Sequence, residues 1–175
     1  MKACHTIFQT EFGYTGIVYT KDPFQLLKIY LPRQTHDMVK NDMMLDFNLQ
    51  NDHHSEIDIF IHQIKYYFKG NPVPTPWAWL NWNNMTELQV KTLKQTALIP
   101  YGAVCSYKKL AQKIGRPKAS RFVGSCMAQN PYPIIIPCHR VIRSDGSIGQ
   151  FGGGITLKKR LLALEKNRSL LANLE

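Results

Sequence analysis

Three prolines at alternate positions, Pro72, Pro74 and Pro76, constrain the fold more than any other feature of this sequence. Proline fixes its own φ angle, lacks an N–H group and disfavours helical conformation in the residue before it. This segment is therefore expected to be an extended linker through which no helix can continue. A chain of 175 residues can hold one large domain or two small domains with separate cores. We predict a first domain, with the linker, over residues 1–76 and a second domain over residues 77–175.

Charge is distributed unevenly along the chain. Residues 1–84 contain 7 Lys and Arg against 8 Asp and Glu, whereas residues 85–175 contain 15 against 4. The formal net charge of +10 therefore lies in the second half. Solubility alone does not require such segregation, but a polyanionic partner of the second half does. A solvated lysine face is the alternative that composition leaves open.

The first domain is predicted to be a small α+β unit, an antiparallel sheet with one helix. The expected strands are residues 6–9, 16–19 and 26–31, each a β-like apolar run bounded by turn residues. The acidic stretch 37–54 has no clear period and is predicted to be a loop with at most a short helix. After it, Ser55 is expected to cap a helix that ends at Gly70, because apolar residues recur there at helical spacing.

The second domain is predicted to be mainly helical. Four helices are expected: one that begins at a Thr86–Gln89 capping box and ends near Leu98, Tyr107–Ile114 capped by Ser106, Lys118 to about Gln129, and a last one capped by Thr156. A short turn at Gly115 joins the second and third, which is the helix-turn-helix pattern of a winged-helix-like domain. Many helical hairpins bind nothing, but the basic charge of this half favours DNA.

The composition argues against several other classes of protein. The four cysteines, Cys4, Cys105, Cys126 and Cys138, lack paired spacing, which favours free thiols in a reducing compartment over a disulfide framework. The N-terminal histidines bring no second thiol, so no metal site is expected. No segment approaches about 18 uninterrupted apolar residues and the N-terminus lacks an apolar leader, so we expect neither a membrane span nor a signal peptide.

The segment from Pro137 to Val141 places Cys138, His139 and an arginine in consecutive positions, directly after an apolar run. The thiolate is the reactive form of cysteine, and a thiol with a pKa of about 8.5 needs a base or a positive charge nearby. An inert core thiol is the structural alternative, since free cysteine is often buried. The charged neighbours argue against it, because a His–Arg pair rarely follows a residue that enters a core.

Glu165 is the second candidate for a catalytic residue. It shares one face of the predicted last helix with Leu157, Leu161 and Leu164. It also lies in the C-terminal part of that helix, where a negative charge opposes the helix dipole. A carboxylate in such a place suggests a buried partner, although a surface position stays open from spacing alone.

The string Asn-Pro-Tyr-Pro-Ile-Ile-Ile-Pro-Cys-His-Arg-Val-Ile, residues 130–142, resembles the active-site segment of the O6-alkylguanine-DNA alkyltransferases, the methylated-DNA–protein-cysteine methyltransferases. The resemblance is strong over residues 86–165 and general in the first half, where it implies a ribonuclease H-like domain. It implies a DNA repair protein that moves the alkyl group of O6-alkylguanine, and of O4-alkylthymine, from double-stranded DNA to its own Cys138. The reaction would be irreversible, would happen once per molecule and would need no cofactor.

The same resemblance implies roles for single residues. Cys138 is the alkyl acceptor, His139 is its base through a water, Glu165 orients that histidine, and Asn130 is a hinge between the helix-turn-helix and the active-site loop. Residues implied to act on DNA are Arg121, which fills the space of the flipped base, Tyr107, which crowds a phosphate and protonates the leaving base, and Ser106, Lys118 and Ala119. The second helix of the motif would enter the minor groove. Pro133, Val141, Phe151 and Gly152 would form the substrate pocket.

One pocket position departs from the family pattern, and a second is a position at which relatives differ. Many relatives have tyrosine where this chain has Phe151, and some have serine where it has Gly152. The missing hydroxyl is expected to affect lesion preference and rate, and the glycine is expected to widen the pocket for larger alkyl groups. The resemblance also implies a monomer, cytoplasmic and nucleoid-associated in a bacterium or archaeon, or nuclear in a eukaryote.

Two rival functions come from other classes. One is a non-enzymatic lesion-binding protein similar to the alkyltransferase-like proteins, which carry tryptophan at the position of Cys138. The other is a thiol hydrolase with a Cys138–His139–Glu165 triad. The thiol argues against the first, and the second gives no reason for the basic half or the helix-turn-helix.

Overall fold

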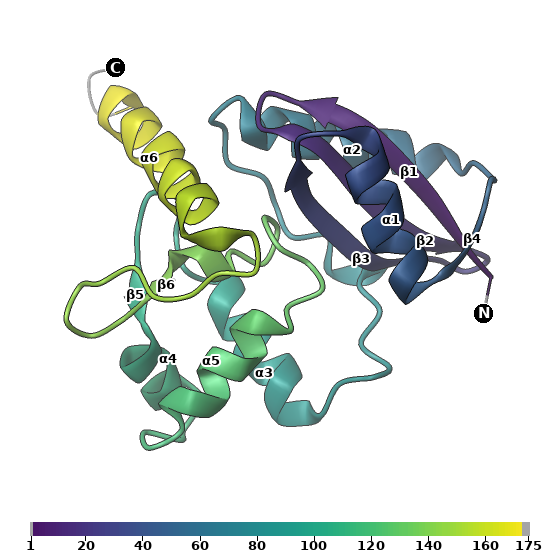
Figure 1. Cartoon of the computed structure of the whole chain (residues 1–175). Helices are drawn as coiled ribbons and strands as arrows, with labels where there is room; N and C mark the ends of the chain where they lie inside the picture. The colour runs from purple at the N-terminus through teal and green to yellow at the C-terminus, as the bar shows by residue number, and fades with distance from the viewer. Residues whose placement is uncertain (1, 173–175) are drawn as a thin grey trace. The chain divides into compact units, whose positions relative to one another are not determined.

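The structure, a computed structural model, describes the backbone of residues 2–172 and the side chains of residues 3–166. The chain divides into two compact units, Met1–Asn81 and Trp82–Glu175 (Figure 1). Within the described part of the chain, no helix combines the length and the apolar character needed to cross a bilayer.

The boundary between the units lies after Asn81, slightly later than the linker prolines suggest. A short 3-10 helix, η1 (Trp77–Trp79), follows the prolines and packs against the first unit. Its Trp79 ring meets Phe24 edge-on, with ring centroids 5.3 Å apart, and Leu80 forms a β-bridge with Leu26. These contacts make residues 77–80 part of the first unit.

The first unit is built on a four-stranded sheet with the order β3-β2-β1-β4. The strands are β1 (Lys2–Thr10), β2 (Gly13–Lys21), β3 (Phe24–Arg33) and β4 (Asn48–Gln50). β1, β2 and β3 pair antiparallel and contain the three predicted strands, whereas the short β4 adds a parallel edge beside β1. The consecutive residues Ile17, Val18 and Tyr19 of β2 are all buried, so both faces of the sheet are covered.

One face is covered by α1 (His36–Asp46), in the stretch that was expected to be mostly loop. The helix has only two buried residues, Val39 and Met43, so its apolar period is too short to stand out in the sequence. Thr35 caps it by accepting a bond from the Met38 N–H at 3.3 Å. Gly16 of β2 allows the close approach, since a Cβ there would lie 2.6 Å from Val39 Cγ1.

The predicted second helix is α2 (Ser55–Phe68), which lies on the opposite side of the sheet from α1 (Figure 1). Its cap is His54 and not Ser55, because His54 Nδ1 accepts the bond from the Glu56 N–H at 3.3 Å. The chain leaves the helix at Gly70, whose φ of +88° suits glycine.

The second unit begins with α3 (Glu87–Ala97), headed by the predicted capping box of Thr86 and Gln89. The helix-turn-helix elements follow as α4 (Tyr107–Lys113), capped as predicted by Ser106, and α5 (Ser120–Ala128). α5 starts two residues later than predicted. The reason is that the turn continues through Lys118 and closes with a bond from the Ala119 N–H to the Arg116 carbonyl at 2.9 Å.

Two short strands and a long helix complete this unit. β5 (Cys105–Ser106) pairs in parallel with β6 (Val141–Ile142), which directly follows the 3-10 helix η2 (Cys138–Arg140). The last helix, α6 (Gly154–Ala172), begins before the predicted cap, so Thr156 lies inside its first turn. The β5–β6 pair therefore connects the segment before α4 to the segment that carries Cys138.

Candidate active site

A tightly bonded turn positions Cys138. The apolar run before it forms a buried turn and not a strand, with Ile134 at a φ of +76° and an Ile136 N–H bond to the Tyr132 carbonyl at 2.8 Å. Asn130 spans this turn: its Oδ1 accepts from the Tyr132 N–H at 3.0 Å, and its Nδ2 donates to the Ile136 carbonyl at 2.8 Å. Asn130 thus ties the end of α5 to the turn that precedes the thiol.

Cys138 is 5% exposed and lines a pocket. Burial raises the pKa of its thiol, while a hydrogen bond from Asn130 and the nearby charge of Lys158 act in the opposite direction. The thiol is therefore protonated at neutral pH in the resting protein. To react as a thiolate it needs a proton acceptor close by.

The candidate proton acceptor is His139, which is fully buried together with Glu165. His139 Nε2 lies 2.7 Å from Glu165 Oε1. Burial favours a protonated carboxyl, but hydrogen bonds from His139 and Arg140 lower the pKa of Glu165 to about 2. Because an ionised carboxylate only accepts, Nε2 carries the proton and Nδ1 carries the lone pair that can take up another. Burial lowers the pKa of His139, more than Glu165 raises it, so the resting imidazole is neutral.

Arg140 is a member of this network that sequence reasoning missed. It is 8% exposed, and its Nε and Nη2 donate to the two oxygens of Glu165 at 2.9 Å each. The expectation that the charged neighbours keep this segment out of the core was wrong, because Glu165 compensates Arg140 inside it. The sequence signal for a buried partner of Glu165 was correct.

Lys158 was missed as well. It is fully buried on α6, and its Nζ donates to the Val141 carbonyl at 2.6 Å and to the Gln150 carbonyl at 3.5 Å. Burial lowers the pKa of this lysine to about 8, with a partial offset from Cys138. A signal was available, since Lys158 precedes Glu165 by seven residues and so shares its helix face.

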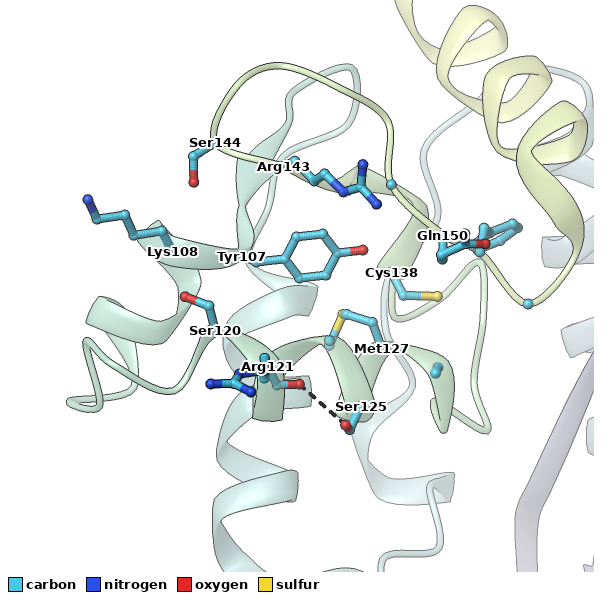
Figure 2. Close-up of a pocket in the computed structure, with 15 residues that line it drawn as sticks. Tyr107, Lys108, Ser120, Arg121, Ser125, Met127, Cys138, Arg143, Ser144 and Gln150 are labelled. Atoms are coloured by element: carbon cyan, nitrogen blue, oxygen red, sulfur yellow. Dashed lines mark hydrogen bonds between the residues drawn. The ribbon is translucent and has the colours of Figure 1, made fainter.

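The pocket above Cys138 has a volume of about 820 Å3, within the range of small-ligand sites (Figure 2). Of the predicted site residues, those that line it are Tyr107, Arg121, Cys138, Phe151 and Gly152. The remaining DNA-contact and pocket candidates do not line it. Ser106 caps α4, Ala119 occupies the N-cap position of α5 without a side-chain bond, Lys118 is exposed in the turn, and Pro133 and Val141 are buried. Arg143 and Gly149 also line the pocket and were not predicted.

Tyr107 forms one wall, with its hydroxyl directed toward the Cys138 side of the pocket (Figure 2). Burial raises its pKa, a charged Cys138 would raise it further, and Arg143 acts in the opposite direction. Gly149 has a φ of +71°, and a Cβ there would lie 3.3 Å from the Tyr107 hydroxyl. On the other side, the ring of Phe151 meets His139 edge-on with centroids 6.4 Å apart.

The helix-turn-helix presents exposed positive charge beside the pocket. Arg121 is in the first turn of α5, is exposed and lines the pocket rim. Further exposed basic residues on α4 and the turn are Lys108, Lys109, Lys113, Arg116 and Lys118. Among the described residues, no three metal-ligating side chains are grouped so that they could hold an ion.

Known proteins are similar in sequence to the second unit of this chain. Residues 87–167 match the family model described as 6-O-methylguanine DNA methyltransferase, DNA binding domain. The methylated-DNA–protein-cysteine methyltransferase of Rattus norvegicus is 55% identical over 73 residues, 41% of this chain and 35% of that protein. The corresponding protein of Mycobacterium tuberculosis (strain H37Rv) is 46% identical over 84 residues, 48% of this chain and 51% of its own length. The matched segment thus spans about half the length of these relatives or less.

A solved structure matches along nearly the whole chain. It is the OGT of Mycobacterium tuberculosis in complex with DNA, 30% identical, with 94% of both chains covered and a TM-score of 0.73. Both compact units are therefore shared with that protein. Together with the segment around Cys138, this shows that the chain belongs to the O6-methylguanine-DNA methyltransferase family.

Proposed function

We propose that this protein repairs DNA by transferring the alkyl group of O6-alkylguanine irreversibly to its own Cys138. The observation that carries the proposal is the arrangement of one protonated thiol in a pocket, with a neutral His139 and an ionised Glu165 behind it. A thiolate is a strong nucleophile toward an alkyl carbon, and guanine is an acceptable leaving group once its oxygen is neutralised. Neither step requires a metal or a redox cofactor.

The reaction balances without any co-reactant. The Cys138 thiol proton passes to His139, through a water as the family resemblance implies, and the sulfur attacks the alkyl carbon in line with the C–O6 bond. That bond breaks, its electron pair stays on guanine, and a proton from Tyr107 neutralises the base. The proton on His139 then restores Tyr107. The products are a thioether on Cys138 and unmodified guanine, so each molecule reacts once.

Access to the alkyl group requires the lesion base to leave the duplex. A stacked base cannot reach a buried sulfur, and extruding it costs a few kcal/mol. The exposed cations of α4, the turn and α5 would neutralise phosphates on either side of the lesion. Arg121, at the pocket rim, is in position to occupy the space that the extruded base leaves.

The remaining residue assignments are proposals of the same kind. Ser106, Lys118 and Ala119 would contact the DNA backbone near the N-termini of α4 and α5. Asn130 would couple a movement of α5 to the turn that carries Cys138. Val141 would accept a bond from guanine only through the lone pair of its carbonyl that Lys158 does not use. We also propose that O4-alkylthymine is a substrate and that the protein acts as a monomer.

Mass spectrometry after incubation with duplex DNA that carries one O6-methylguanine tests the function. We expect every molecule to gain one methyl group at Cys138 and then to stop reacting. Binding without any mass change would favour a lesion-binding protein instead. Repeated turnover of a thioester or peptide substrate would favour a thiol hydrolase.

A further inference from the structure

The carboxylate of Glu165 accepts hydrogen bonds from four donor groups on two separate segments, the Cys138–Arg140 turn and the turn that contains Gly102. Its Oε1 is 2.7 Å from His139 Nε2 and 2.9 Å from Arg140 Nη2. Its Oε2 is 2.9 Å from Arg140 Nε and 3.1 Å from the Gly102 backbone nitrogen. Arg140 therefore contacts both oxygens, and a planar guanidinium in this two-point arrangement fixes the plane of the carboxylate.

Arg140 is itself held in place on its far side. Its Nη1 donates to the Ile99 carbonyl at 2.6 Å, and its guanidinium carbon lies 5.5 Å from the centroid of the Tyr101 ring. Ile99, Tyr101 and Gly102 belong to the turn between α3 and β5. The guanidinium thus bridges that turn to α6, and Glu165 cannot rotate away from His139 without breaking several buried bonds.

Arg140 also compensates the charge of Glu165. A buried carboxylate alone beside His139 would stabilise the imidazolium and keep the histidine protonated, which would prevent it from acting as a base. Arg140 and Lys158 both oppose that effect and, with burial, keep the pKa of His139 below its ordinary value. The other charged groups that face His139 are Glu165 and, once ionised, Cys138.

We propose that Arg140 is a positioning residue for proton transfer: it orients Glu165 and balances its charge, so that His139 rests neutral and accepts the Cys138 proton. The inference rests on the proposed alkyl transfer and deepens it. Before transfer the site holds one ion pair, Arg140 with Glu165. After the proton moves it holds a second, His139 with the Cys138 thiolate. Among Arg140, Glu165, His139 and Cys138, positive and negative charges are therefore equal in number at both stages.

The test uses the full chain, free O6-benzylguanine as substrate, and three variants. Arg140→Met removes the charge and both bonds, Arg140→Lys keeps the charge but loses the two-point contact, and Arg160→Met is a control at an exposed position of α6. The rate of alkyl transfer is measured from about pH 5 to about pH 9, across the range where histidine titrates. The pKa of His139 is measured in parallel by NMR of its labelled imidazole.

For Arg140→Met we expect the pKa of His139 to rise, so that the rate falls about tenfold or more near pH 6 and recovers partly at higher pH. For Arg140→Lys we expect a near-native pKa of His139 and a rate that is lower at every pH. Arg160→Met should match the wild type. The proposal is overturned if Arg140→Met leaves both the pKa of His139 and the pH profile unchanged.

Two further comparisons keep the test decisive. If Arg140→Met does not fold, Arg140→Met/Glu165→Gln removes the unpaired carboxylate, and the pKa of His139 should then be higher than in Glu165→Gln alone. Equal values would contradict the role of Arg140. Failure of the wild type to react with either O6-benzylguanine or methylated DNA would overturn the proposed function, whereas the NMR result would still decide what Arg140 does to His139.

Discussion

Two arginines of the second unit illustrate opposite uses of the same side chain. Arg121 is exposed at the rim of the pocket, on the basic face formed by α4, the turn and α5. Arg140 is almost fully buried and donates to Glu165 and to the Ile99 carbonyl. An exposed guanidinium is available for a phosphate or a vacated base position, while a buried one can only organise its neighbours.

The comparison separates two tasks within one small unit. The exposed face has positive charge in excess, which suits a polyanionic partner. The buried network around His139 has compensated charge, which suits a proton transfer that must not depend on solvent. Changes on the exposed face should therefore affect DNA substrates alone, and changes in the buried network should affect every substrate.

The largest effect is expected from Cys138→Ala. Alkyl transfer should be lost completely, because Cys138 is the one thiol among the described residues that line the pocket. Affinity for duplex DNA should change by less than about threefold, since a buried thiol contributes little to phosphate contact. Mass spectrometry and a DNA titration measure the two quantities. Cys105 and Cys126 are buried thiols of the same unit and serve as internal controls. Methyl transfer to either of them in the variant would contradict the assignment.

Glu165→Gln should slow the reaction about 100-fold or more with methylated duplex and with free O6-benzylguanine alike. The amide cannot stabilise the imidazolium, so less thiolate forms at a given pH, and a more alkaline buffer should restore part of the rate. Removing one partner of a buried ion pair also costs about 3–5 kcal/mol of stability. Thermal unfolding must therefore confirm that the variant is folded at the assay temperature. If the rate fell with the duplex only, Glu165 would act on DNA binding or base extrusion, as the exposed residues do, and the proposed separation of the two tasks would be wrong.

Salt concentration should affect DNA binding by the exposed face and leave the buried network unaffected. If three or four phosphates are neutralised, affinity for undamaged duplex should fall roughly 40- to 150-fold between about 50 mM and about 200 mM salt. The double substitution Lys113→Gln/Arg116→Gln should reduce the log-log slope by about 2, whereas Lys69→Gln, exposed in the first unit, should leave it unchanged. A slope near zero in the wild type would show that the basic face has another purpose.

The smallest effect is expected from Gly152→Ser, a change in the lining of the pocket. A Cβ at this position meets no atom within 4 Å, so the serine should fit without loss of stability. It should narrow the pocket and lower the rate with O6-benzylguanine relative to O6-methylguanine by about threefold. An unchanged ratio would mean that this glycine does not set the preference for alkyl size.

The sequence was sufficient for the parts of the molecule that depend on neighbours along the chain. The Thr86–Gln89 box, the Ser106 cap and the Cys138–His139 pair are all encoded within a few residues, and the structure confirms the two caps. Glu165 was correctly inferred to have a buried partner, because its place on an apolar helix face is unfavourable for an isolated charge.

The sequence was insufficient where a partner comes from a distant segment. Arg140 reaches Glu165 across 25 positions, and no periodicity or cap indicates that pairing. Lys158 shares a helix face with Glu165, but that spacing does not indicate its partner, the Val141 carbonyl 17 positions earlier. α1 was missed for a related reason, since only two of its residues are buried and tertiary contacts with the sheet hold the rest.

The most direct test of the division between the exposed face and the buried network is a crossed rate measurement. Arg121→Ala and Glu165→Gln are each assayed with methylated duplex and with free O6-benzylguanine, which needs no base extrusion. We predict that Arg121→Ala slows the duplex reaction about 10- to 100-fold and leaves the free base within about twofold of wild type, because Arg121 acts on extrusion alone. Glu165→Gln should slow both reactions by the same factor. If the two variants reduced both substrates in the same proportion, the exposed and the buried groups would not perform separate tasks, and the account would be contradicted.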